Sequence, residues 1–146
     1  MKKTLYVISN EKIFKKKEFF FCDNLDMKTT PEGLNKEFKV KIIARKSEIN
    51  RRQNINLENI RVFSNIFSYL YEVIKSSKDN DSKFLLISLT PYTFLASILL
   101  KFLGKKPFLY LRSNGYDEYK IILGSTGKFI YHLMFIIAVT ITTLVS

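Results

Sequence analysis

The densest cluster of side chains able to do chemistry follows a short apolar run late in the chain. Residues 112–119 read Arg-Ser-Asn-Gly-Tyr-Asp-Glu-Tyr and directly follow residues 108–111, Phe-Leu-Tyr-Leu. The guanidinium of Arg112 is a planar fork of donors that suits phosphate or carboxylate groups. Ser113 and Asn114 carry side chains that can hydrogen-bond sugar hydroxyls. The segment is therefore a candidate binding loop.

Two further residues of this loop have both a functional and a structural interpretation. Gly115 allows a positive φ or a close approach of the backbone to a ligand. Glu118 is a candidate base, or a partner that pairs with Arg112 and fixes a turn. We favour the binding interpretation, because the loop is expected at the carboxyl end of a strand, where open α/β sheets bind ligands.

Two other segments are expected at the same edge of the sheet. Asn10 follows the first β-branched and aromatic run of the chain, and Thr90 and Tyr92 flank Pro91 after the apolar residues 84–88. Thr90 can cap a helix that begins at Pro91, and the free N–H groups of such a helix favour anions or sugar oxygens. Plain capping explains Thr90 equally well.

Several patterns associated with catalysis are incomplete in this sequence. Asp79 and Asp81 have the spacing of a metal-binding motif but precede a strand, so we expect a solvated turn. Residues 124–128, Gly-Ser-Thr-Gly-Lys, lack the spacing of a phosphate-binding loop. His132 stands alone in an apolar helix, and Cys22 is expected to be a buried, neutral thiol. These patterns assign no metal site and no catalytic residue.

The composition predicts a single basic domain. The chain has 146 residues, 47% of them hydrophobic, with 24 Lys and Arg against 13 Asp and Glu, a net charge of +11. A basic protein is drawn to polyanions such as anionic lipid, nucleic acid or phosphorylated substrates. An AT-rich genome explains the abundance of Lys, Asn and Ile equally well. One cysteine excludes an intramolecular disulfide and fits a reducing cytoplasm.

Apolar segments alternate with segments of helical periodicity. Strands are expected at residues 4–9, 40–44, 60–63, 84–88 and 108–111, with a last one at the C-terminus. Helices are expected at residues 66–76, 91–103, 117–123 and 128–139, with a weaker one near 31–36, and residues 10–37 are otherwise expected to be irregular. This alternation predicts an α/β fold, a Rossmann-like parallel sheet with helices on both faces.

The order of these elements resembles the N-terminal half of GT-B glycosyltransferases. The residues that carry the resemblance are the strand end at 88–92 and the segment 110–119, Tyr-Leu-Arg-Ser-Asn-Gly-Tyr-Asp-Glu-Tyr. The nearest group is the glycosyltransferase-4-like enzymes of bacterial surface polysaccharides. The resemblance implies that Asn114, Gly115 and Glu118 line a cleft. The family's glycine-rich turn after the first strand is replaced here by Ser-Asn-Glu at residues 9–11.

The resemblance implies the acceptor-binding half of a transferase in polysaccharide biosynthesis at the cell envelope. Residues 1–146 would form this half, which binds no cofactor, while a C-terminal domain binds the nucleotide-sugar donor. The family's pair of glutamates with seven residues between them is absent from the sequence. We therefore expect a truncated chain that is inactive alone. Its expected partners are a lipid-linked sugar acceptor, the missing domain and an anionic membrane surface.

The expected location is the cytoplasm, peripheral on the inner face of the plasma membrane. Residues 129–146 carry no formal charge apart from His132, and their number approaches the roughly 20 residues of a spanning helix. A tail-anchored membrane protein with a basic cytoplasmic domain is therefore the alternative. The β-branched residues 140–145 favour a terminal strand instead. Nucleic-acid binding is not expected, because no signature of a known module is present.

Overall fold

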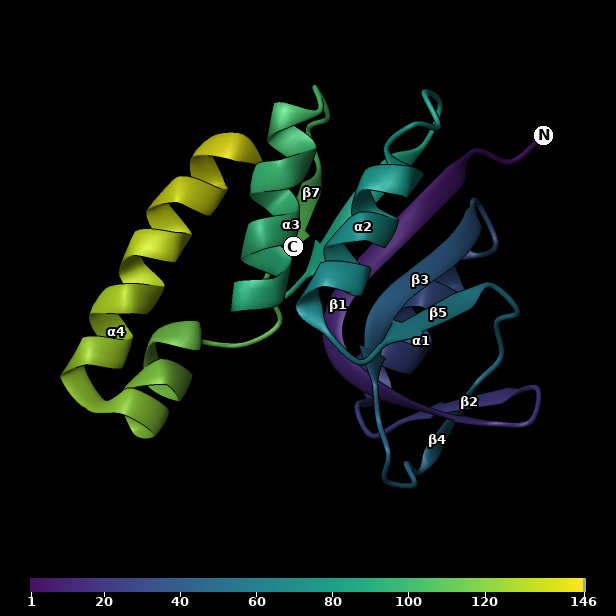
Figure 1. Cartoon of the computed structure of the whole chain (residues 1–146), viewed down its shortest axis with the longest axis horizontal. Helices are drawn as coiled ribbons and strands as arrows, with labels where there is room; N and C mark the ends of the chain where they lie inside the picture. The colour runs from purple at the N-terminus through teal and green to yellow at the C-terminus, as the bar shows by residue number, and fades with distance from the viewer. Residues whose placement is uncertain (146) are drawn as a thin grey trace.

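The computed structural model describes residues 1–145 of the chain, which form eight strands and four helices (Figure 1). The strands are β1 (Thr4–Lys16), β2 (Phe19–Cys22), β3 (Lys39–Lys46), β4 (Gln53–Ile55), β5 (Ile60–Phe63), β6 (Lys83–Ile87), β7 (Phe108–Tyr110) and β8 (Thr143–Val145). The helices are α1 (Leu25–Leu34), α2 (Ile66–Ser76), α3 (Pro91–Phe102) and α4 (Gly115–Ile141).

Six of these strands form a parallel sheet in the order β5-β3-β1-β6-β7-β8. When only these six parallel strands are numbered, in the order in which they occur along the chain, the sheet order is 3-2-1-4-5-6, which is the order of doubly wound α/β folds. The predicted Rossmann-like α/β fold is confirmed, but the sheet is mixed rather than purely parallel. The strands β2 and β4 pair antiparallel and extend the sheet from the far end of β1.

Apolar side chains of the central strand β1 alternate between two cores. Leu5 and Val7 pack in the core that also holds Met27 of α1. Tyr6 and Ile8 pack in the other core, with side chains from α2, α3 and α4. Figure 1 shows α2 and α3 in front of the sheet, α4 beside α3, and α1 behind β3 and β5. Helices thus cover both faces, as the alternation of strands and helices predicts.

The expectation of an irregular segment over residues 10–37 is wrong. The strand β1 continues to Lys16 across an irregular register between Ile8 and Lys12, then turns at Lys17, whose φ is +56°, into β2. The helix α1 also begins earlier than expected, since Asn24 Oδ1 accepts a hydrogen bond from the Asp26 N–H at 2.9 Å. This antiparallel arm was missed because β2 and β4 are only four and three residues long and β4 is mostly polar.

The helices α2 and α3 have the clearest capping residues in the sequence, and both begin where these caps predict. Asn65 Oδ1 accepts from the Ser68 N–H at 2.9 Å at the start of α2. Thr90 and Thr93 form a reciprocal capping box at the start of α3, with Pro91 as its first residue. Each cap satisfies backbone donors that an open helix end leaves unpaired. The entry points of α2 and α3 at the edge of the sheet are therefore specified by local sequence.

The helix α4 is folded back on itself at Gly124, whose φ of +68° and ψ of −150° are not helical. A short segment, residues 115–123, precedes this kink, and a longer one, residues 125–141, leads into β8. The two expected helices and the terminal strand are therefore present. A side chain at Gly127 would overlap the carbonyl oxygen of Tyr119, so the absence of a Cβ there lets the segments approach.

Replacing Gly127→Ala is expected to lower the free energy of unfolding by about 1–3 kcal/mol, because the methyl group displaces backbone rather than a flexible side chain. The matched control is Gly33→Ala in α1, where nothing lies within 4 Å of the added Cβ. It should change stability by less than about 1 kcal/mol. Urea unfolding followed by circular dichroism measures both, and equal losses would contradict the packing assigned to Gly127.

Candidate functional site

The carboxyl ends of β6 and β7 lie beside the middle of β1, so three separate parts of the chain meet there. Ser9 lies opposite Ile87, and Ile87 lies opposite Tyr110. Ser88 and Leu111 leave the sheet at this level, where β1 passes through its irregular register between Ile8 and Lys12 before it continues to Lys16. Strand order reverses between β1 and β6, because the chain proceeds from β1 to β3 on one side and from β6 to β7 on the other. Ligands of doubly wound folds bind in the crevice at such a point.

One polar group at this edge centres on Asn10. The Arg45 Nη1 donates to Asn10 Oδ1 at 3.3 Å, and the same guanidinium lies 4.4 Å from the centre of the Tyr92 ring. The buried Tyr69 hydroxyl donates to the Ser9 carbonyl oxygen at 2.8 Å and packs edge-on against Tyr92. The structure thus brings the predicted site residues Asn10 and Tyr92 together, through an arginine at the end of β3.

A second polar group centres on Glu11, the residue after Asn10. Burial raises the pKa of the Glu11 carboxyl, and the neighbouring charges of Arg112 and Arg51 lower it only in part. Arg51 already forms a 2.6 Å ion pair with Asp23. Arg112 makes no ion pair within 4 Å in the described part of the chain. The charge of Arg112 therefore acts on the Glu11 carboxyl near the switch point without forming an ion pair with it.

Two buried polar atoms at this edge have no hydrogen-bond partner among residues 1–145, Arg112 Nη1 and Ser88 Oγ. Buried polar atoms in native proteins are nearly always paired, so an unpaired one calls for an explanation. Ser88 also has a φ of +64°, a left-handed conformation that costs a non-glycine residue energy. Backbone strain and unpaired donors collect at ligand sites, and both occur here where β6 ends.

The remaining predicted residues of the 112–119 loop serve the start of α4. Asn114 caps the helix, accepting from the Tyr116 N–H at 3.1 Å and donating to Asp117 Oδ2 at 2.7 Å. Gly115 is buried against the Tyr131 ring, where any Cβ would overlap it. These contacts give Asn114 and Gly115 a structural use that the sequence pattern did not indicate.

Three further predicted residues are exposed or already paired. Ser113 and Glu118 are exposed, and no Arg112–Glu118 ion pair occurs within the part of the chain that the structure covers. The Thr90 hydroxyl accepts from the Thr93 N–H at 3.3 Å as the cap of α3. Of the predicted residues, Asn10, Tyr92 and Arg112 therefore form the centre of the candidate site.

Sequence reasoning missed Glu11, Arg45 and Ser88 as members of this site. Arg45 stands near the end of β3, so the strand-end rule applied to that strand would have found it. Glu11 stands beside Asn10, but its proximity to Arg112 depends on the irregular register of β1 after Ile8. Ser88 carries no sequence signal for its positive φ, since serine rarely adopts it.

The structure offers no metal site to this edge. Among residues 1–145, no three His, Cys, Asp or Glu side chains are grouped closely enough to hold a metal ion. Asp79 and Asp81 lie exposed in the turn before β6, as expected. Cys22 is buried, and this burial raises the pKa of its thiol to about 11. The cysteine is therefore a neutral core residue, as predicted.

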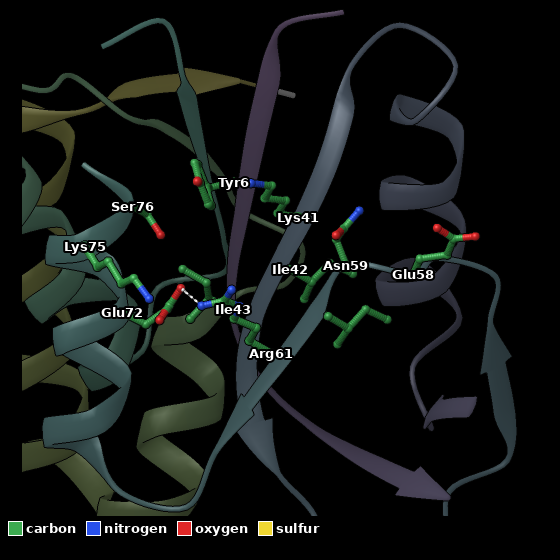
Figure 2. A pocket seen from close by; sticks show the side chains of 11 residues that line it. Tyr6, Lys41, Ile42, Ile43, Glu58, Asn59, Arg61, Glu72, Lys75 and Ser76 are labelled. Carbon is green, nitrogen blue, oxygen red and sulfur yellow. Dashed lines mark hydrogen bonds and ion pairs between the residues drawn. The ribbon is translucent and has the colours of Figure 1, made fainter. Parts of the chain in front are cut away.

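A separate hollow of about 330 Å³ lies between α2 and the strands β3 and β5 (Figure 2). Arg61 and Glu72 form a 2.7 Å ion pair within it, and the Lys41 ammonium lies 5.4 Å from the Tyr6 ring centre. Tyr6 and Lys41 stand early in their strands, so the hollow lies towards the amino ends, away from the switch point. Its cations and carboxylates are mixed, so we favour the carboxyl edge as the candidate site.

Replacing Glu11→Gln is expected to raise the free energy of unfolding at pH 7. The folded pKa of Glu11 lies above its unfolded value, so its ionisation penalises the folded state as pH rises between the two values. This increase in the free energy of unfolding should be present at pH 7. It should vanish below about pH 4, where the Glu11 carboxyl is protonated in both the folded and the unfolded state. Urea unfolding at both pH values measures it. The exposed Glu58→Gln is the control, and a loss of stability at pH 7 in Glu11→Gln would contradict the assigned environment.

Comparison with protein-family models, with curated proteins and with solved structures gave no match. The resemblance to GT-B glycosyltransferases therefore stays a prediction, and the functional argument depends on the geometry of the carboxyl edge.

Proposed function

We propose that this chain is the acceptor-binding half of a glycosyltransferase that moves a sugar from a nucleotide-sugar donor to a polysaccharide or lipid-linked acceptor in the cytoplasm. The observation that carries the proposal is the partly buried Glu11 carboxyl within reach of the Arg112 charge near the switch point, together with the unpaired donors of Arg112 and Ser88. Sugar hydroxyls both donate and accept hydrogen bonds. A carboxylate, a guanidinium and a serine hydroxyl together match both needs.

The Glu11 carboxylate is the group we assign to accept a proton from the acceptor hydroxyl. A general base works best when its pKa approaches the working pH, and burial shifts the Glu11 pKa in that direction. The freed hydroxyl oxygen bonds to the anomeric carbon of the donor, while the bond from that carbon to the diphosphate breaks. The diphosphate leaves with the electron pair. This step needs no metal, in keeping with the side chains present at the edge.

Arg112 would hold the acceptor and favour the ionised form of Glu11. Its Nη1 is free to donate to a sugar oxygen, because no hydrogen-bond partner occupies it within residues 1–145. Its positive charge also lowers the pKa of Glu11 and so limits the shift caused by burial. On the other side of the edge, the Arg45 guanidinium over the Tyr92 ring orders Asn10. The donor site would lie on a second domain that closes over this edge.

Binding of simple glycosides to the full chain tests the proposal. Titration with a panel of methyl glycosides, followed by amide NMR, should shift signals of residues 9–11, 88–92 and 111–113. Arg112→Gln is expected to weaken this binding roughly tenfold or more, the effect of losing a hydrogen bond to a charged group.

The matched control is Arg61→Gln, which removes the same charge at the hollow behind α2 and should leave glycoside binding unchanged. Shifts confined to that hollow, or equal losses in the two variants, would contradict the assignment. So would binding of free nucleotide but no glycoside at the carboxyl edge, since that result would make this domain the donor half.

A further inference from the structure

The helix α4 exposes an unusual amount of apolar surface on both sides of its kink. Eight of its large apolar side chains are at least 40% exposed, including Ile121 at 85% and Phe129 at 62%. We call these eight the apolar face of α4: Ile121, Ile122, Leu123, Phe129, Ile130, Leu133, Ile136 and Ile137. Contiguous apolar patches of this kind mark surfaces that meet another molecule or a membrane.

In the longer segment of α4, this face forms one stripe along the helix. Phe129, Leu133 and Ile136 follow one another at spacings of four and three residues, which place them on the same side. The opposite side is different, since Tyr131 and Met134 are buried in the core that α2 and α3 share. Figure 1 shows this segment alongside α3 with its other side facing away from the sheet. Both sides of this helical segment are therefore apolar, but one side is buried against the protein and the other is exposed.

Charged residues flank the apolar face at its ends. Residues 129–141 contain no Asp, Glu, Lys or Arg. Lys120 and Lys128 are exposed on either side of the kink at Gly124, and Lys101 and Lys106 are exposed at the end of the neighbouring α3. Asp117 and Glu118 are the acidic residues of α4, both in its first turn. The four exposed lysines outnumber these two acidic residues, and this local positive charge favours an anionic partner over a neutral one.

The helix α4 is long and apolar enough to cross a membrane by length and composition alone. Its packing argues against that use in this fold. Tyr131, Met134 and Ala138 are buried, and β8, which follows α4, pairs with β7 with Leu144 opposite Leu109. Spanning would strip these side chains from the core and remove β8 from the sheet. An apolar stripe on a helix that stays packed suits the plane of a membrane interface instead.

We propose that the apolar face of α4 docks on an anionic lipid membrane, with the helix lying in the membrane plane. The exposed isoleucine, leucine and phenylalanine side chains enter the boundary between headgroups and acyl chains, and the flanking lysines contact the headgroups. The proposal does not depend on sugar transfer.

Flotation of the full chain with lipid vesicles tests this docking. The chain is expected to float with vesicles of phosphatidylglycerol and phosphatidylcholine and to float weakly with phosphatidylcholine alone. The double variant Leu133→Gln and Ile137→Gln should lose at least roughly tenfold in partitioning, because two apolar side chains no longer enter the lipid. Both positions are 45–47% exposed, so the fold should tolerate the change, and circular dichroism confirms it.

The matched control is Phe67→Gln on α2, which removes an 82% exposed aromatic side chain from another helix and should leave flotation unchanged. Equal losses in the control, or no flotation of the unaltered chain, would overturn the proposal. So would dimers in light scattering that only the Leu133 and Ile137 variant abolishes, since a second copy would then cover the face. Carbonate extraction must release the docked chain, and resistance to it would indicate a spanning helix.

Discussion

Parallel pairing of β1 on both of its sides is the constraint on which the other features depend. With β3 on one side and β6 on the other, β1 fixes the order of the sheet and the point where that order reverses. The strands of the parallel sheet then all point towards the same edge, so side chains far apart in sequence come together there. Glu11 and Arg112 are about a hundred residues apart in the chain, yet the charge of Arg112 lowers the pKa of Glu11.

The sequence was most informative where a physical signal was local. Continuous apolar runs predicted the buried strands β6 and β7, and Asn65 and Thr90 predicted the starts of α2 and α3, because caps and buried strands need only neighbouring residues. The antiparallel arm was missed, since its strands are short and β4 pairs with a strand that is distant in sequence. The place of Glu11 could not be predicted either, because it depends on the irregular register of β1. Gly115 was assigned to binding, whereas its contact with Tyr131, sixteen residues later, gives it a packing role.

The two proposed surfaces follow one another in the chain without sharing residues. The loop that carries Arg112 leads directly into α4, and α4 turns back at Gly124 so that its longer segment packs along α3. The fold therefore places a polar, partly buried edge next to an exposed apolar helix. That combination suits a domain whose acceptor is delivered at a lipid surface, and it is the structural link between the two proposals.

The pKa of Glu11, followed by NMR of its labelled side-chain carboxyl, is the most direct measure of the central claim that Glu11 and Arg112 meet at the switch point. The account predicts a pKa above the ordinary glutamate value in the unaltered chain and a further rise in Arg112→Gln, because the guanidinium lowers it. An ordinary value, or one that Arg112→Gln leaves unmoved, would show that the two side chains do not share a site.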